Sequence, residues 1–250
     1  MHFLADVTLL QLVLIVALAA FSAIAGGIAG YGTGALMPLV LVPMIGAAPV
    51  VPIIAISAIF SNTARVVAFR RVVDLHRALV ALAVAVPACA LGAWLYTLLS
   101  GRGAALVIGT TLIATVPLRR LLRRRGHRLG AKGFTAGAAV WGLLMGGTTG
   151  SGIILLSVMM AVGLEGAAVI ATDAMVSIVT GLAKVGVFAL AGVLTRQVIV
   201  IACLIGAVAF PCTFIAKLIV ERMPLHVHTA LLDAVVIIGG LVMIAGAFRA

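Results

Sequence analysis

A stripe of polar residues runs along one face of an otherwise apolar segment in the second half of the chain. Its members are spaced i, i+4, i+7 and i+11: Asp173, Ser177, Thr180 and Lys184. On a helix this spacing places all of them within a narrow sector of one face. A charge at the centre of a membrane helix costs roughly 2.5–3.5 kcal/mol on insertion scales, so each charged member is a candidate functional residue. The stripe is therefore expected to face protein or water rather than lipid.

A matching stripe in the first half of the chain consists of Ser57, Ser61 and Arg65, with Asn62 beside it. Because three helical turns separate Asp173 from Lys184, these two side chains cannot pair directly. We therefore expect Lys184 and Arg65 to remain free for a ligand or for another acid. The alternatives are that both cations reach toward the nearest loop and that Asp173 complements the dipole at a helix start.

Two glycine-rich stretches interrupt long apolar segments at matching places in the two halves. Their residues are Gly32, Thr33 and Gly34 in the first copy and Thr148, Thr149, Gly150, Ser151 and Gly152 in the second. A broken membrane helix persists only where it is buried in protein or lines a cavity. Two such breaks at corresponding positions indicate a transporter's binding site. The alternative is that the glycines merely let helices pack closely.

The chemistry that these residues suggest is the binding of a small anion. Two cations, several hydroxyl groups and the N–H groups of helices that restart after each break all favour negative charge. Acidic residues are too few to coordinate Na⁺ or a divalent cation. Asp233, in the last apolar segment, is with Asp173 a candidate for a proton carrier or counter-ion. We assign no metal, no cofactor and no catalytic residue, since His226 and His228 lack a third ligand nearby.

Composition restricts the class of protein to a polytopic all-α membrane protein. Hydrophobic residues make up 64% of the 250 residues and charged residues only 9%. The net charge of +11 is concentrated in residues 65–77 and 119–132. By the positive-inside rule both segments are expected on the cytoplasmic side, so the charge indicates membrane orientation and not nucleic-acid binding. The lipid bilayer is thus an expected partner.

The chain divides into two similar halves, residues 1–118 and 133–250, joined by a basic linker over 119–132. Each half is expected to hold a glycine-broken helix pair and three membrane spans. The expected segments are 9–30, 35–45, 50–69, 78–99 and 104–118, then 134–146, 153–163, 169–190, 198–220 and 229–248. An offset of 118 relates Gly32 to Gly150, and an offset of 119 relates Arg65 to Lys184 and Phe69 to Phe188. This correspondence predicts two homologous repeats.

Whether the repeats are inverted or parallel depends on the broken pairs. If each pair is a hairpin, every half has five elements, the second half is inverted, and both termini lie outside. If each pair is one broken crossing, the halves are parallel and both termini lie inside. The pieces around the second break are too short to span alone, and the start of the chain lacks basic residues. We favour the inverted arrangement.

The sequence resembles the sulfite exporter TauE/SafE family, also called the toluene-sulfonate uptake permease family. The resemblance lies in the duplicated glycine-rich segment, here Gly30 to Pro38, in the helix around residues 57–62, and in the return of the pattern over residues 134–184. The second copy departs from the pattern, because Leu156 stands where the first has proline. The resemblance implies a bacterial inner-membrane permease for sulfite, sulfonates or carboxylates, coupled to the proton gradient.

The favoured function is a secondary transporter of small organic or sulfur-containing anions that works by alternating access between two repeats. An anion channel and a non-transport membrane scaffold are the alternatives. An intramembrane serine protease is disfavoured, because no histidine lies inside an expected span to activate Ser151. The substrate, the direction of transport, the coupling ion and the oligomeric state do not follow from the sequence.

Overall fold

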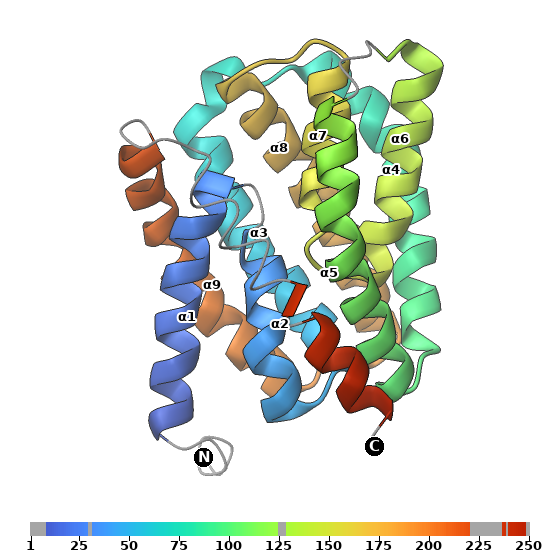
Figure 1. The fold of residues 1–250 in the computed structure, drawn as a ribbon. Coiled ribbons are helices and arrows are strands. Elements are labelled where there is room, and N and C mark those ends of the chain that lie inside the picture. The colour runs from blue at the N-terminus through green and yellow to red at the C-terminus, as the bar shows by residue number, and fades with distance from the viewer. Residues whose placement is uncertain (1–8, 30–31, 125–128, 221–236, 239, 249–250) are drawn as a thin grey trace.

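The protein is built of long apolar helices. The computed structural model describes residues 9–29, 32–124, 129–220, 237–238 and 240–248, and every regular element in these ranges is helical (Figure 1). Five stretches of helix in the described residues are long and apolar enough to cross a membrane: Val50–Val72, Leu75–Thr97, Gly101–Leu118, Ala167–Leu190 and Arg196–Ile215. The chain is therefore a multi-pass α-helical membrane protein, as its composition predicts.

The helices follow the apolar segments of the sequence closely. Those of the first half are α1 (Leu9–Ala29), α2 (Gly32–Ile45), α3 (Val50–Phe69), the short 3-10 helix η2 (Arg70–Val72), α4 (Leu75–Thr97) and α5 (Gly101–Arg124). Those of the second half are α6 (Ala131–Gly147), α7 (Gly152–Ala161), α8 (Ala167–Leu190) and α9 (Arg196–Val220). The last expected segment is helical at 237–238 and 240–248, and its remainder lies outside the described residues.

Most helix ends lie within three residues of the expectation, and two differences affect the predicted break and the predicted linker. Gly32, Thr33 and Gly34 form the first turn of α2 and not a break within the helix. The basic linker is shorter than predicted, because α5 continues to Arg124. Arginine and leucine have high helix propensity, and no glycine or proline interrupts residues 118–125.

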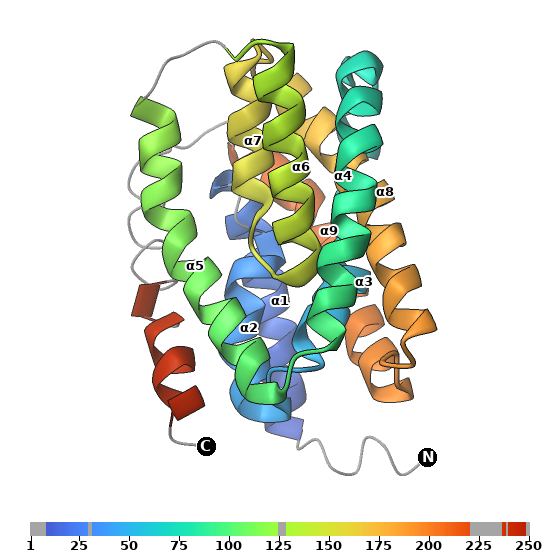
Figure 2. The ribbon, with the colours of Figure 1, turned by 90° about the vertical axis from the view of Figure 1, so that its right-hand side faces the viewer.

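The two glycine-broken pairs are antiparallel hairpins that enter the bundle from opposite ends. Helices α1 and α2 have their outer ends at the bottom of Figure 1, whereas α6 and α7 have theirs at the top (Figures 1 and 2). The described ends of the chain, Leu9 and Phe248, also lie at the bottom. This is the arrangement that the hairpin interpretation requires; that the two halves are homologous repeats stays a prediction.

The two basic segments lie at the same end of the bundle. Arg77 donates from Nη2 to the carbonyl oxygen of Val162, just after α7, at 2.9 Å. The N–H of Leu129, at the end of the basic linker, donates to the carbonyl oxygen of Ala161 in the same place. Both segments therefore meet the end of α7, at the top of Figure 1. Their common side agrees with the positive-inside expectation.

Helices α4 and α6 pack backbone against backbone through small residues, and they run side by side in Figure 2. A Cβ atom built on Gly142 would lie 2.5 Å from the Ala85 carbonyl oxygen, and one on Gly146 would overlap the Cys89 carbonyl oxygen. Close packing, the alternative role for the glycines, thus applies to these two residues, which precede the second glycine-rich stretch.

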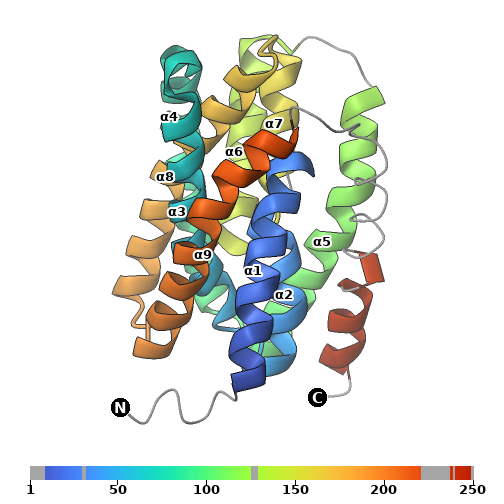
Figure 3. The same ribbon diagram turned by 90° about the vertical axis from the view of Figure 1, so that its left-hand side faces the viewer.

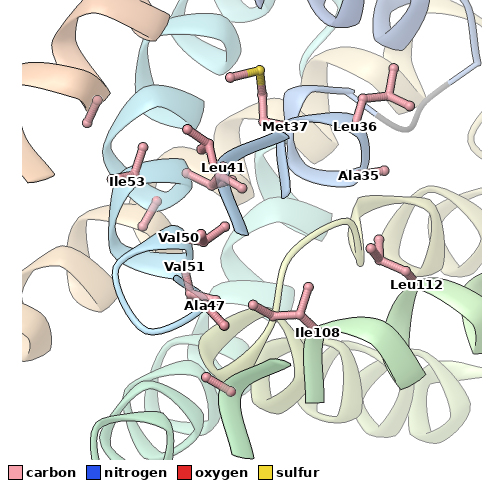
Figure 4. Packing of buried hydrophobic residues seen from close by; sticks show 14 of the residues in the cluster. Ala35, Leu36, Met37, Leu41, Ala47, Val50, Val51, Ile53, Ile108 and Leu112 are labelled. Carbon is pink, nitrogen blue, oxygen red and sulfur yellow. The ribbon is translucent and has the colours of Figure 1, made fainter. Parts of the chain in front are cut away.

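The apolar core forms two clusters. One draws mainly on α1, α2, α3, α5 and α9; Figure 3 shows α9 beside α1, and Figure 4 shows Leu41, Val50 and Ile108 among the residues packed there. The other draws on α4, α6, α7 and α8. The first hairpin therefore packs mainly in one cluster and the second hairpin mainly in the other.

Asp74 caps the start of α4 and provides a pH-dependent contribution to stability. Its carboxylate accepts the N–H of Arg77 at 2.9 Å and pairs with the Arg77 guanidinium at 2.8 Å. The backbone hydrogen bond, followed by the side-chain bond and charge of Arg77, holds the pKa of Asp74 below its usual value. The carboxylate thus stabilises the fold above its unfolded pKa of about 4 and ceases to do so as the pH falls through the lower folded pKa.

We therefore expect the melting temperature of Asp74→Ala to lie below that of the wild type by a constant amount at neutral pH. The difference should shrink below about pH 4, where the wild-type carboxylate becomes protonated. Thermal unfolding of both purified proteins from neutral to acid pH measures this. A difference that persists unchanged in acid would show that the cap does not depend on the charge of Asp74.

Candidate functional site

Residues from both hairpins and from two long helices line a small cavity of about 90 Å³. A cavity of this size accommodates a small ion. The predicted site residues that line it are Thr33, Gly34, Ser61, Asn62, Arg65, Thr148, Thr149, Gly150, Ser151, Gly152, Asp173, Ser177 and Lys184. The fold thus brings most of the two stripes and both glycine-rich stretches to one place.

Two helices begin at this cavity, one from each hairpin. Helix α2 contributes Thr33 and Gly34 from its first turn, and α7 contributes Gly152 with Ser151 just ahead of it. The hairpin tips touch, since a Cβ atom on Gly34 would lie 2.9 Å from the backbone N of Gly150. Gly150 itself has φ +79°, a conformation that glycine adopts without strain. The N–H groups of both helix starts favour negative charge in the cavity.

Helix α3 supplies an amide, a hydroxyl and a cation to the cavity. Arg65 lies within α3, a full turn before the end at Phe69, and not in a loop. Its guanidinium is close enough to Asp173 of α8 for the two charges to interact. Asp173 is therefore an acid that Arg65 meets, because tertiary packing places the acid of one stripe opposite the cation of the other.

Lys184 is also engaged, in a way that the sequence did not indicate. Its side chain is only 3% exposed, and Nζ donates to the carbonyl oxygens of Met145 at 2.6 Å and Thr148 at 3.0 Å. These carbonyls belong to the end of α6, where a helix leaves acceptors unpaired and its dipole favours a cation. The expectations that Lys184 is free or reaches toward a loop are both wrong. Lys184 closes the broken end of α6, and one of its three N–H donors remains beyond these two bonds.

Three predicted residues lie elsewhere. Ser57 is fully buried and donates to the Ile54 carbonyl of its own helix. Thr180 donates to the Val176 carbonyl, and its own carbonyl faces Cys89 of α4. These two and Gly32 are not among the cavity-lining residues. Asp233 lies outside the residues that the structure describes.

Trp141 and Met145 of α6 line the cavity and were missed by the sequence analysis. They precede Thr148 by seven and three residues, so a helical projection from the break would have placed them on the same face. Trp141 is completely buried. Its indole Nε1, Thr149 Oγ1 and Asp173 Oδ1 are buried and have no hydrogen-bond partner among the described residues. All three atoms belong to residues that line the cavity.

The donor set suits an anion better than a metal. Two cations, one acid, hydroxyl groups and two helix starts surround the cavity. Within the described ranges, His, Cys, Asp and Glu do not gather in groups of three that could hold a metal ion. A compact oxyanion matches these donors, because its oxygens accept hydrogen bonds and its charge is balanced by the cations.

A protein-family model matches most of the chain. The family model described as "Sulfite exporter TauE/SafE" matches residues 13–243, and therefore both hairpins and every element that lines the cavity. Searches of curated proteins and of solved structures returned no significant match.

Proposed function

Because the chain belongs to the sulfite exporter TauE/SafE family, we propose that it is a secondary transporter of small sulfur-containing or organic anions. Sulfite, small sulfonates and small carboxylates are the candidate substrates. Such a transporter resides in the bacterial inner membrane with its basic end in the cytoplasm. A cavity of about 90 Å³ favours the smallest of these anions.

The observation that carries the proposal is the convergence of both halves on one polar cavity. Each hairpin contributes the start of a helix, and the long helices α3 and α8 contribute the cations Arg65 and Lys184. Helix starts and cations together form an anion site. Discontinuous helices that meet in this way, one from each half, are typical of secondary transporters.

Alternating access is the mechanism that this arrangement favours. The hairpins enter from opposite ends (Figure 1) and touch at Gly34 and Gly150. Each hairpin packs mainly in its own apolar cluster. Rocking of one cluster against the other would open the cavity first to one side and then to the other, and a proton gradient would supply the driving force.

The proposal is tested by flux into proteoliposomes. Labelled sulfite uptake by the wild type should respond to an imposed proton gradient, whereas a passive channel would be insensitive to it and a scaffold would give no uptake. We expect Arg65→Gln to lower uptake at least about tenfold, since hydrogen bonds to a charged group contribute about 1.5–3 kcal/mol.

The matched control for this variant is Arg102→Gln. Arg102 lies over the Phe248 ring at 5.3 Å, at the end of the bundle away from the basic segments. The Arg102→Gln variant also loses a guanidinium group, and it should transport like the wild type. Equal uptake by both variants would contradict an anion site at Arg65.

A further inference from the structure

Three buried polar atoms without a partner in the described residues belong to residues that line the cavity. They are Trp141 Nε1 of α6, Thr149 Oγ1 of the break and Asp173 Oδ1 of α8. Their side chains are 0%, 3% and 3% exposed. Buried polar groups are almost always paired, so each exception requires an explanation. Three exceptions around one small cavity indicate that a ligand completes them.

The hydrogen-bonding chemistry of the three atoms restricts the form of that ligand. An indole N–H can only donate, a threonine hydroxyl can donate, and a carboxylate oxygen can only accept. The oxygens of an oxyanion can accept from Trp141 and Thr149. Against Asp173, however, a bare oxyanion places two acceptors of like charge together. A proton between the ligand and Asp173 removes this conflict and pairs all three atoms.

The balance of charge in the cavity also requires one proton. The cavity-lining charges are Arg65, Lys184 and Asp173, which together carry one net positive charge when ionised. A singly charged anion balances this positive charge. A doubly charged anion leaves one net negative charge, which is costly in a buried site. A divalent oxyanion therefore needs one proton to enter.

The other titratable groups around Asp173 are already paired or are cations, so Asp173 accepts that proton. Asp74, whose N–H donates to the neighbouring Thr172, is already paired with Arg77. Cys89 of α4 donates to the Thr180 carbonyl, and Arg70 and Arg71 of η2, which packs on α8, are cations. Among the described residues that line the cavity, Asp173 is the only acid.

We propose that the cavity binds a small oxyanion together with one proton, which is shared between an anion oxygen and Asp173, while Trp141 and Thr149 donate to the remaining oxygens. This inference rests on the proposed anion transport and specifies the ligand as a singly protonated oxyanion such as hydrogen sulfite. The proton comes from water and travels with the anion, and no bond to sulfur forms or breaks.

The test counts protons by isothermal titration calorimetry of the purified protein with sodium sulfite. In alkaline solution free sulfite is a dianion, and titrations in two buffers of different ionisation enthalpy give the number of protons taken up per anion. We expect one proton for the wild type and none for Asp173→Asn, whose amide N–H can donate directly to the dianion. Asp74→Asn, which removes a carboxylate outside the cavity, should still take up one.

Trp141→Phe provides a separate measurement of the donor role. It keeps most of the buried ring but removes the indole N–H, so we expect about tenfold weaker sulfite binding with the proton count unchanged. Unchanged affinity would exclude Trp141 from the site.

The outcomes separate the inference from the proposed function. Sulfite binding by the wild type without proton uptake would overturn the shared proton and leave anion transport standing. Proton uptake by Asp173→Asn would likewise overturn the shared proton and leave anion transport standing. Absence of sulfite binding to the folded wild type would overturn both. The number of protons that the wild type takes up per anion tests the shared proton even if a variant fails to fold.

Discussion

Lys184→Met is expected to abolish anion transport and to lower the melting temperature by roughly 5–20 °C. The substitution keeps an unbranched apolar side chain but removes the donor to the Met145 and Thr148 carbonyls. Each of the two buried acceptors left unpaired costs about 1–3 kcal/mol, and each kcal/mol corresponds to roughly 2–4 °C in a chain of this size. The end of α6 would no longer be held at the cavity, so the break would lose its shape.

The control for this variant is Lys132→Met, because Lys132 is an exposed lysine in the first turn of α6. It should leave both transport and the melting temperature near their wild-type values. If Lys184→Met lost transport but kept its melting temperature, Lys184 would act on the substrate and not on the backbone of the break. If it changed neither, the capping role of Lys184 would be refuted.

Gly146→Ala is the second substitution with a large expected effect. The new methyl group would overlap the Cys89 carbonyl oxygen and lie 2.7 Å from the Ala93 nitrogen. Both contacts are with backbone, so α4 and α6 would have to move apart. Overpacking of this kind costs typically 1–3 kcal/mol, which predicts a melting temperature lower by roughly 2–12 °C.

The matched control is Gly186→Ala in α8, where an added Cβ meets nothing within 4 Å. Alanine is favoured over glycine in a helix by about 1 kcal/mol, so this variant should be as stable as the wild type or slightly more so. Thermal unfolding of the two variants therefore gives changes of opposite sign. Equal changes in melting temperature would show that helix propensity, and not the α4–α6 contact, determines the effect of Gly146→Ala.

Much of the fold and of the candidate site can be predicted from local sequence. Helix α3 has the predicted bounds, and α8 begins two residues before the prediction, because apolar runs punctuated by glycine and proline specify membrane helices locally. The duplicated breaks and the spacing of Ser61 and Arg65 or of Asp173 and Ser177 also identified residues that share the cavity. The spacing of polar residues and the two glycine-rich stretches are properties of the sequence itself.

The partners of these residues required the tertiary structure. Lys184 binds carbonyls that lie 36 and 39 residues away along the chain, and Gly146 is needed because α4 passes against it. Trp141 is a candidate only in the folded structure, where it lines the same cavity as Asp173 and its indole N–H has no partner among the described residues. Periodicity tells which residues share a helix face, but not which other helix meets that face. Pairing and close approach depend on that meeting, and only the packed bundle decides it.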